Sequence, residues 1–403
     1  MKSLTKFFLL FSICICLLLS VGCGKKRYVY YTNMYDGNYE ILDKSYKTGG
    51  LIEGLSLPGS ETEDIDTSAY TSKVKRFFAM TAAAELGIYS DFAAEDREAQ
   101  EEAEANKKAK TEFEKLTDAV MAKLYEIEKA LSSTITNSDV YNFNNAQAGA
   151  QLEVSQITYE VLSIAKDIYD LTEGYYNPAL YYNVQAYGFG GAEDYDYGTL
   201  PDDEIIAKYT DLSTHFCDIR LKEEDGRYFV TKPEYTVEVD GETLSLKLDL
   251  GGIGKGYAVD CVDRLIDEYG YKFGYFSFGT SSMLVKNNVG DGNFRLGLSS
   301  PRSPSREPYL STAIRNEKLS TSGDNEQFYM VGGGCSDRVR YCHIIDPTTG
   351  KPIQTGIMSV TVIGGGAAED DALTTAIMCM GREKAIQFIA EKLNDRRVVF
   401  TVE

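Results

Sequence analysis

Histidine is scarce in this sequence, because His215 and His343 are the only two among 403 residues. Most metal sites built from several imidazoles are therefore excluded. The eight cysteines show no CxxC spacing, and three of them lie within the first 23 residues. An odd number remains, which argues against a disulfide framework and against a zinc site. The remaining cysteines are Cys217, Cys261, Cys335, Cys342 and Cys379.

Positive charge is also in short supply, because 41 basic residues stand against 61 acidic ones and the net charge is −20. A surface with this excess repels nucleic acids and anionic lipid headgroups. We therefore expect no nucleic-acid partner. Attachment to a membrane would have to come from a lipid rather than from a basic patch.

The sequence begins with an apolar run that is too short to cross a bilayer. Two lysines precede the run, which covers residues 7–19, whereas a spanning helix needs about 20 residues. Small residues at 20–22 then precede Cys23, as a lipoprotein signal peptidase requires. We predict a lipoprotein signal peptide over 1–22, lipidation of Cys23, and a lipid-anchored location on the extracytoplasmic face of the cell membrane. An ordinary secretory signal with an incidental cysteine, or a loose membrane anchor, is the alternative.

The chain is long enough, at 43% hydrophobic content, to bury the core of one large domain or two ordinary ones. Residues 23–75 are rich in Gly, Ser, Thr and Asp with little periodicity, which predicts a linker. Residues 94–110 are nearly all Ala, Glu, Gln and Lys, so we interpret them as a charged helical insertion. The folded domain is expected at residues 76–403.

Hydrophobic periodicity predicts helices first and then a mixture of helices and strands. Apolar residues recur every three or four positions at 113–131 and 154–168, which indicates two amphipathic helices. Later patterns predict strands at 244–250, 273–278, 358–363 and 398–402, with helices at 257–269, 371–380 and 382–393. This arrangement favours one α+β domain.

A glycine-rich segment, DLGGIGKGYAVD, extends from Asp249 to Asp260. It follows the alternating leucines of a predicted strand and begins a helix, so its backbone N–H groups can point at an anion. Glycine also allows a phosphate to approach the backbone closely. The segment matches neither a Walker A loop nor the GxGxxG spacing of dinucleotide-binding folds. A tight connection without a ligand is the alternative interpretation.

Three further polar segments lie closer to the C-terminus. STSGD precedes an aromatic pair, and alone it favours a simple hairpin entry. HIIDPTTG places His343 and Asp346 near a strand end, where catalytic groups are often presented. DDALTTA places Asp371 and Thr375 on one face of a helix, and such oxygen atoms suit Mg²⁺. A capped helix with Asp371 in its first turn is the alternative.

Taken in order, these four motifs resemble the ApbE family of FAD:protein FMN transferases, over a region from about Phe77 to the C-terminus. Weaker matches lie upstream: residues 138–144 resemble the family's Ser-to-Asn segment, and TEGYYNP at 172–178 resembles its TGGxFDP turn. Met80 stands where the family has a Met-Gly-Thr-like start. The chain departs from the family pattern at Thr81, Asn177, Gly254 and residues 279–281.

The resemblance implies a fold and a reaction. The expected fold is a single large mixed α+β domain of the ApbE, T-fold-like type. The expected enzyme uses Mg²⁺ to transfer FMN from its substrate FAD to a Thr or Ser hydroxyl of another protein, with release of AMP. The acceptor is expected to be an extracytoplasmic protein, such as an electron-transfer subunit.

The resemblance also implies roles for individual residues. Mg²⁺ would be held by the Gly254 carbonyl, Asp371 and Thr375. His343 would orient or deprotonate the acceptor hydroxyl, and Lys255 would offset the charge of the pyrophosphate. His343, Asp371 and Lys255 form the expected catalytic set. The expected FAD contacts are Met80, Ser138, Asn144, Asp249, Lys255, Asp260, Ser322, His343 and Asp346.

Two other functions are compatible with the same residues. In a Mg²⁺-dependent FAD pyrophosphatase, water replaces the protein hydroxyl, and FMN and AMP are released. In a flavin-binding lipoprotein without catalysis, FAD would bind and not turn over. The presence of Asp371, Thr375 and His343 together argues against the second of these.

Overall fold

The computed structural model describes residues 27–33, 40–46, 70–93, 95–97, 110–192, 199–287, 292–303, 308–332 and 338–403. Within these ranges, no helix is both long enough and apolar enough to cross a membrane. The predicted signal peptide at 1–22, Cys23 and almost all of the charged insertion at 94–110 lie outside the described residues. Those predictions therefore stay untested by the structure.

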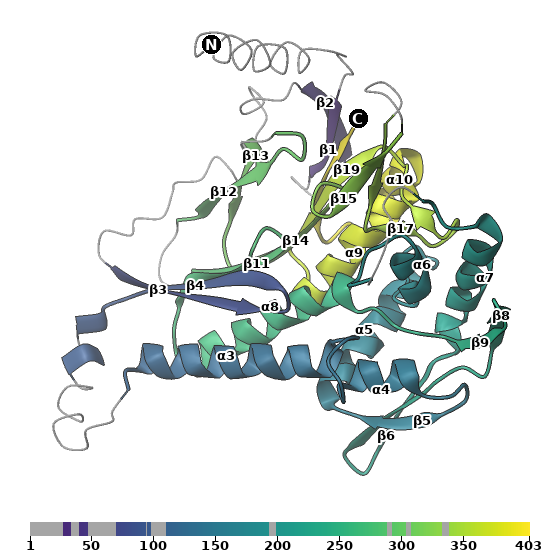
Figure 1. The fold of residues 1–403 in the computed structure, drawn as a ribbon. Helices are drawn as coiled ribbons and strands as arrows, with labels where there is room; N and C mark the ends of the chain where they lie inside the picture. Colours follow the sequence, from purple (N-terminus) through teal and green to yellow (C-terminus); the bar gives the residue numbers. More distant parts are fainter. Residues whose placement is uncertain are drawn as a thin grey trace, which may run out of the picture.

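Helices lie mainly in the first half of the described chain, and a long run of strands, β10 to β19, separates α8 from the last two helices (Figure 1). The elements that precede residue 250 are β1 (Arg27–Asn33), β2 (Glu40–Tyr46), β3 (Thr71–Ala79), β4 (Ala82–Ser90), α3 (Glu112–Leu131), α4 (Asp139–Asn145), β5 (Gln151–Val154), α5 (Gln156–Leu171), α6 (Tyr181–Ala186), α7 (Asp203–Thr214), η2 (His215–Asp218), β6 (Arg220–Glu224), β7 (Arg227–Thr231), β8 (Thr236–Val239) and β9 (Glu242–Ser245). Those that follow are α8 (Gly251–Glu268), β10 (Phe273–Phe278), β11 (Ser282–Asn287), β12 (Phe294–Ser299), β13 (Pro308–Ile314), β14 (Glu317–Gly323), β15 (Phe328–Val331), β16 (Val339–Cys342), β17 (Ile345–Asp346), β18 (Lys351–Pro352), β19 (Ile357–Ile363), α9 (Ala367–Met380), α10 (Arg382–Lys392) and β20 (Arg397–Val402).

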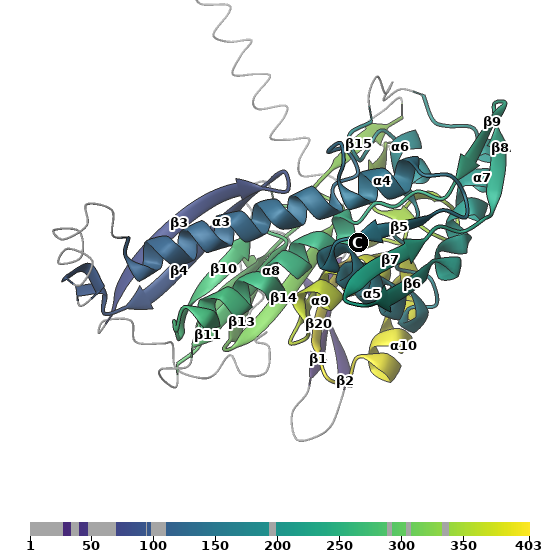
Figure 2. The ribbon, with the colours of Figure 1, turned by 90° about the horizontal axis from the view of Figure 1, so that it is seen from below.

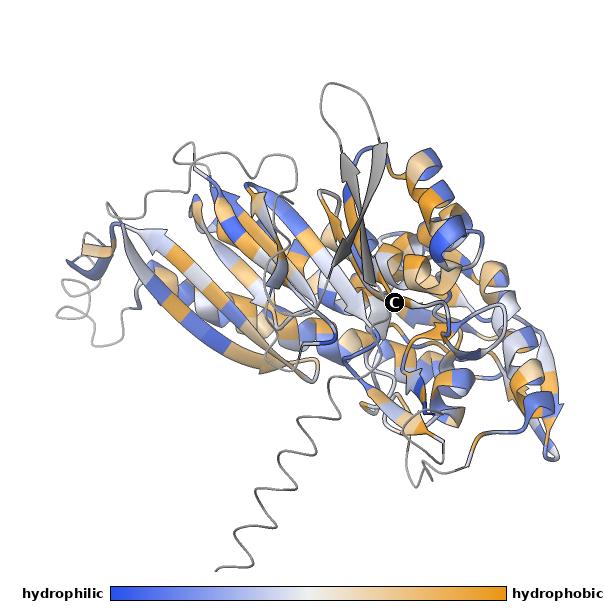
Figure 3. Cartoon of the chain, turned by 90° about the horizontal axis from the view of Figure 1, so that it is seen from above, coloured by the Kyte–Doolittle hydropathy of each residue, from blue (hydrophilic) through white to orange (hydrophobic). Residues whose placement is uncertain are grey.

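Nine of the described strands form one antiparallel sheet, in the order β2-β1-β20-β19-β14-β11-β10-β4-β3. Strand β19 lies inside it, and all of its residues are buried. Strand β3 lies at one edge, and its side chains are mostly exposed. Figure 3 shows the corresponding alternation of hydrophilic and hydrophobic residues along strands that have one covered face.

Helices α8 and α9 cover one face of the sheet, and α3 lies beside α8 (Figure 2). The two covering helices approach each other closely at Gly256, where a Cβ atom would lie 2.1 Å from the Ala367 carbonyl oxygen. Helix α3 forms because Thr111 and Glu114 make a capping box at its N-terminus. Its apolar residues recur at helical spacing, so one face is buried against the core.

The opposite face of the sheet has a smaller core of its own. Strands β12 and β13 form a hairpin there, and Leu298, Leu310 and Ile314 pack with Leu319 and Val399 of the sheet. Where this hairpin covers the large sheet, the strands beneath it bury side chains on both faces. The result is the mixed α+β domain predicted from the sequence.

The predicted linker at residues 23–75 is wrong in part. Strands β1 and β2 lie inside that range and pair with each other, and β1 also pairs with β20 near the C-terminus. Strand β3 begins at Thr71, which is also earlier than the predicted domain boundary. Isolated hairpins are only marginally stable, so β1 and β2 depend on a sheet edge that lies more than 300 residues away in the chain.

Most predicted helices and strands are confirmed, with shifted ends. The helices at 113–131 and 154–168 correspond to α3 and α5, and the strands at 273–278, 358–363 and 398–402 correspond to β10, β19 and β20. The predicted strand at 244–250 is wrong after Ser245, although its leucines at 246, 248 and 250 are buried. Helix α8 begins at Gly251, six residues before the predicted start.

Candidate active site

A cavity of about 660 Å³ lies where the N-terminus of α8 meets α9, β14 and the segment after β16. Seven of the predicted site residues line it, six of them from the four motifs and one, Met80, from the upstream match: Met80, Asp249, Lys255, Ser322, His343, Asp371 and Thr375. This volume is within the usual range for a site that encloses a small-molecule ligand. The structure thus brings together motifs that are distant in the sequence.

The N-terminus of α8 forms one wall of the cavity. Leu250 precedes the helix and supplies no side-chain cap, but Oδ1 of Asp249 accepts a hydrogen bond of 2.8 Å from the Gly251 N–H. Gly251, Gly252 and Lys255 also line the cavity. The partial positive charge of the helix terminus and the Lys255 ammonium group therefore face the same space, which suits an anionic ligand such as a phosphate.

Asp371 and Thr375 of α9 lie opposite this helix terminus. Asp371 is only 3% exposed, and its Oδ2 accepts a hydrogen bond of 3.0 Å from the Gly256 N–H. Burial raises the pKa of the Asp371 carboxyl, and the nearby Lys255 opposes that rise. The Ser322 hydroxyl of β14 contacts the Thr375 hydroxyl at 3.5 Å. The three oxygens face the cavity from two elements.

These oxygens fit a magnesium ion better than a softer metal. A buried carboxylate with a hydroxyl one helical turn away is a hard, oxygen-only donor set. No cluster of three or more His, Cys, Asp or Glu side chains that could hold a metal occurs in the described ranges. Protein oxygens would thus supply only part of the coordination, as is usual for Mg²⁺ at a phosphate.

The third predicted ligand, the Gly254 carbonyl, is not brought to the cavity. Gly254 is buried within α8, and a Cβ atom there would meet Met80 Cε at 3.1 Å and Leu131 Cδ1 at 3.5 Å. It does not line the cavity. The prediction used the position of Gly254 in a motif, whereas its neighbours Met80 and Leu131 are the residues that line the cavity there.

His343 borders the cavity from the segment that follows β16. Its ring lies edge-on to Phe189, with ring centroids 6.4 Å apart, and its Nδ1 lies 3.4 Å from the Gln327 carbonyl oxygen. Burial lowers the pKa of His343 from its usual value of 6.5, and Lys255 lowers it further, against the effect of the Gln327 carbonyl. The imidazole is therefore neutral near pH 7 and able to accept a proton.

Met80 reaches the cavity from the turn between β3 and β4. Met80 and Thr81 both have positive φ angles, of 50° and 60°, as in the two-residue turns that suit tight hairpins. The Glu128 carboxylate of α3 accepts a hydrogen bond of 2.9 Å from the Met80 N–H. Glu128 was not predicted as a site residue, because in the sequence it is only a polar position beside the apolar face of α3.

Four of the predicted FAD contacts lie outside the cavity. Ser138 caps the N-terminus of α4 through the Tyr141 N–H. Asn144 is buried, donates to the Leu248 carbonyl at 2.9 Å and accepts from the Leu248 N–H at 2.7 Å. These two residues therefore hold the chain just before the glycine-rich segment, and the structure indicates a positioning role rather than a contact.

Asp260 and Asp346 are the other two predicted contacts that the structure places elsewhere. Asp260 of α8 accepts hydrogen bonds from the Ala367 and Ala368 N–H groups at 3.0 and 2.9 Å, and so caps α9. Asp346 accepts from the N–H and hydroxyl of Thr348 at 2.8 and 2.7 Å, which is an Asx-type turn. Both were placed by motif position, and both stabilise the backbone that carries site residues.

Two neighbouring residues of the TEGYYNP segment also line the cavity. Asn177 accepts a hydrogen bond from the Ala179 N–H at 2.9 Å and donates to the Ser213 carbonyl at 3.1 Å, so its amide supports the turn. Tyr176 is buried, and its hydroxyl has no hydrogen-bond partner among the described residues. Burial raises the pKa of Tyr176 well above its usual value, and Asp371 and Asp249 raise it further.

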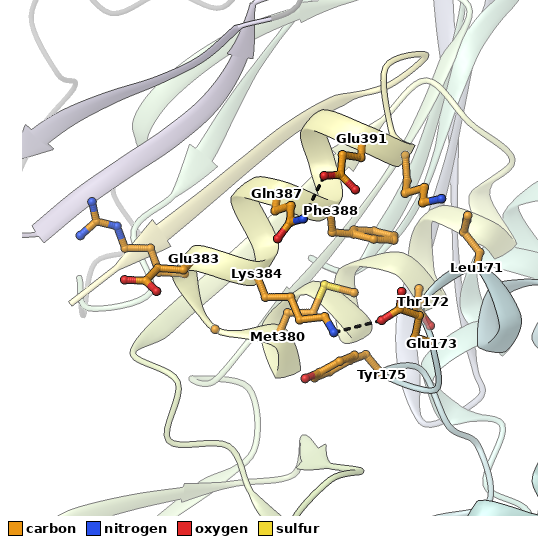
Figure 4. A pocket seen from close by; sticks show the side chains of 13 residues that line it. Leu171, Thr172, Glu173, Tyr175, Met380, Glu383, Lys384, Gln387, Phe388 and Glu391 are labelled. Atoms are coloured by element: carbon orange, nitrogen blue, oxygen red, sulfur yellow. Dashed lines mark hydrogen bonds and ion pairs between the residues drawn. The ribbon is translucent and has the colours of Figure 1, made fainter.

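A second, more open pocket of about 790 Å³ lies between α10 and the end of α5 (Figure 4). Its side chains include Glu173, Lys384 and Glu391, and Lys384 forms an ion pair of 3.1 Å with Glu173. It shares Tyr175 with the first cavity, but none of the predicted site residues lines it. We therefore assign the candidate active site to the cavity at α8 and α9.

The fold is shared with solved ApbE proteins. The ApbE protein of Thermotoga maritima aligns with a TM-score of 0.65 and 22% identity, covering 82% of this chain and 94% of that one. The flavin transferase ApbE of Vibrio cholerae aligns with a TM-score of 0.63 and 24% identity, covering 83% and 94%. At these identities the likeness shows a shared fold.

Comparison with related sequences shows the family to which the chain belongs. The FAD:protein FMN transferases of Klebsiella pneumoniae and Treponema pallidum are 29% and 26% identical over 280 and 294 residues. These alignments cover 69% and 71% of this chain and 75% and 77% of those proteins. The profile of the ApbE family matches residues 87–400, which is most of the chain. The protein belongs to the ApbE family, as its four motifs predicted.

Proposed function

We propose that this protein is a Mg²⁺-dependent FAD:protein FMN transferase that modifies a Thr or Ser hydroxyl of another protein. Membership of the ApbE family, with relatives named FAD:protein FMN transferase, supports a transferase that uses FAD. The observation that carries the proposal is a single cavity that holds an anion-binding helix terminus, the buried pair Asp371 and Thr375, and a neutral His343.

The proposed reaction balances as a phosphoryl transfer. The acceptor oxygen attacks the phosphorus on the riboflavin side of the FAD pyrophosphate, the bond from that phosphorus to the bridging oxygen breaks, and AMP leaves with that oxygen. The hydroxyl proton is lost. The products are AMP and a protein that carries FMN through a phosphodiester bond.

The residues of the chain would position the substrate and manage its charge. The N-terminus of α8 and Lys255 would bind the pyrophosphate, and the Ser322 hydroxyl, which bonds the Thr374 hydroxyl at 2.7 Å, would hold α9 in place. Asp371 and Thr375 would hold Mg²⁺, which neutralises phosphate charge when it is bound. Such positioning and charge neutralisation are the main sources of rate enhancement in phosphoryl transfer.

His343 is the proposed general base. A proton on Nδ1 would serve the contact with the Gln327 carbonyl and leave Nε2 free to accept the hydroxyl proton. The lowered pKa keeps the imidazole unprotonated at neutral pH. Asp249 also faces this space, so the imidazolium that forms during the reaction has a carboxylate nearby.

Incubation of the protein with FAD, Mg²⁺ and a candidate acceptor, followed by in-gel flavin fluorescence, tests this function. We expect fluorescence on the acceptor band, its loss on chelation with EDTA, and its loss in Asp371→Asn. Fluorescence that appears only as free FMN would support the pyrophosphatase alternative. FAD that binds without turnover in the presence of metal and acceptor would support the flavin-binding alternative.

We also propose that the mature protein is anchored by a lipid on Cys23 at the extracytoplasmic face of the membrane, where its acceptor would be an electron-transfer subunit. The short apolar run before Cys23 and the acidic chain support a lipid over a basic patch. Cys23→Ala should release the protein or leave it as an unprocessed precursor. A processed, membrane-bound Cys23→Ala protein would contradict the anchor.

A further inference from the structure

The buried hydroxyl of Tyr176 in the candidate active site has no hydrogen-bond partner among the residues that the structure describes. The side chain is 3% exposed, and its hydroxyl is one of few buried side-chain polar atoms in the described ranges that lack a hydrogen bond. The Tyr176 N–H is held by the Thr172 hydroxyl at 3.1 Å. The backbone is therefore fixed, and the free hydroxyl does not result from a loose turn.

The ring of Tyr176 lies beside the first turn of α8 and close to the proposed metal ligands. A Cβ atom on Gly252 would lie 3.7 Å from Tyr176 Cε2 and 3.4 Å from Thr375 Oγ1. The Asp371 and Asp249 carboxylates are near enough to act on the phenol electrostatically. The ring thus lines the same part of the cavity as the helix terminus, which favours an anion, and the hydroxyl is buried beside it.

An unpaired buried hydroxyl destabilises a folded protein, because it loses its hydrogen bonds to water and gains none. Phenylalanine would fill the same volume without that loss. A ligand acceptor in the cavity would give the hydroxyl its missing partner.

We propose that the Tyr176 hydroxyl donates a hydrogen bond to a pyrophosphate oxygen of the bound dinucleotide. This inference rests on the proposed function, because that function places FAD in the cavity. The phosphate oxygens are the acceptors that the helix terminus, Lys255 and the cavity wall would bring closest to the hydroxyl. Tyr176 is then a further substrate-binding residue, which adds a donor to those in the four motifs.

The Tyr176→Phe variant of the full-length protein in mild detergent tests the inference through two readouts. Without ligand, its melting temperature should rise, because a buried unpaired polar atom is removed. With Mg²⁺ present, its affinity for FAD should fall roughly ten- to hundredfold, the usual effect of a lost hydrogen bond to a charged group. ADP, which has the pyrophosphate without the flavin, should lose affinity by the same factor.

Tyr257→Phe is the matched control. Tyr257 is also buried, but its hydroxyl already donates to the Glu160 carboxylate, and it does not line the cavity. Its removal should lower the melting temperature and leave FAD affinity unchanged. The two variants therefore shift stability and affinity in different combinations.

The other possible results distinguish a failure of the Tyr176 contact from a failure of the proposed function. Wild-type FAD affinity in Tyr176→Phe, or a lower melting temperature of that variant without ligand, would overturn the inference and leave the proposed function standing. A loss of affinity for FAD but not for ADP would move the contact to the flavin half, which also overturns it. Wild-type protein that binds no FAD would contradict the proposed function itself.

Discussion

The Asp260→Asn variant tests whether Asp260 caps helix α9, as the structure indicates, or contacts FAD, as its place in the motif predicted. The Asp260 carboxylate accepts from two N–H groups in the first turn of α9 and from the Lys318 ammonium group at 2.8 Å. The residue before α9 is Gly366, which supplies no side-chain cap. Helix α9 carries Asp371 and Thr375, so Asp260 stabilises the helix that holds the proposed metal ligands.

The expected loss of stability follows from these contacts. Asparagine keeps one acceptor oxygen and loses the charge, so about one hydrogen bond to a charged group is lost, worth roughly 1.5–3 kcal/mol. Breaking a buried ion pair can cost about 3–5 kcal/mol, but Lys318 keeps Asp263 at 2.9 Å and its side chain is 23% exposed. We therefore expect a total of about 2–3 kcal/mol and a melting temperature lower by roughly 5 °C.

The assay is denaturant unfolding together with FAD titration on the same preparation. Asp260→Asn should lose stability and keep FAD affinity within about twofold of the wild type, since a capping residue makes no ligand contact. Asp371→Asn is the opposite case, because removal of a buried charge should keep or raise stability while transfer is lost. A large loss of FAD affinity in Asp260→Asn at wild-type stability would refute the capping role.

Three further changes are expected to have distinct effects. Burial, with a smaller effect of Lys247, lowers the pKa of Lys232 from 10.5 to about 8. Because the unfolded chain binds more protons between those pH values, the stability of the wild type relative to Lys232→Met should rise by about 3 kcal/mol from pH 8 to 10.5. Unfolding at several pH values measures this difference, and a difference that does not change with pH would contradict the prediction. Gly256→Ala should lower the free energy of unfolding by more than about 4 kcal/mol, because the alanine Cβ would lie 2.1 Å from the Ala367 carbonyl oxygen. A denaturant melt close to that of the wild type would show that α8 and α9 can move apart at little cost. His343→Gln should keep FAD binding and lose roughly a hundredfold or more in single-turnover rate. The rate of the wild type should fall on the acid side only below pH 6.5, because the pKa of His343 is lowered. His215→Gln is the control, and near-wild-type transfer by the His343 variant would exclude His343 as the base.

Apolar patterning was a reliable guide wherever an element packs against the core. Helices α3 and α5 and strands β10, β19 and β20 were predicted because packing against the core needs apolar residues at fixed spacing. The order of the four motifs also predicted which segments meet at the cavity. His343, Asp371 and Thr375 line that cavity, and they were assigned because their motifs resemble those of the ApbE family.

Positions within the motifs did not predict which residues face the ligand. Gly256 looks like a glycine for phosphate approach, yet the structure shows that it allows α8 to cross α9. Asn144 and Asp260 act on backbone groups 104 and more than 100 residues away. Local sequence carries no signal of such long-range partners, because they depend on how the elements pack.

Strands β1 and β2 were missed for a related reason. Their sequences, RYVYYTN and EILDKSY, are rich in Tyr and β-branched residues, which is a signal for strands. The Gly, Ser and Asp residues around them obscured that signal. What makes them strands is the free edge of β20, and only the fold reveals that edge.

Transfer of FMN from FAD to a protein hydroxyl can be tested directly by the ratio of FMN added to AMP released. An acceptor protein is incubated with this protein, FAD and Mg²⁺, and its intact mass and the AMP released are determined together. One FMN should be added through a Thr or Ser of the acceptor for each AMP released, and none should be added when that residue is replaced by Ala. AMP released with an equal amount of free FMN and an unmodified acceptor would contradict the account.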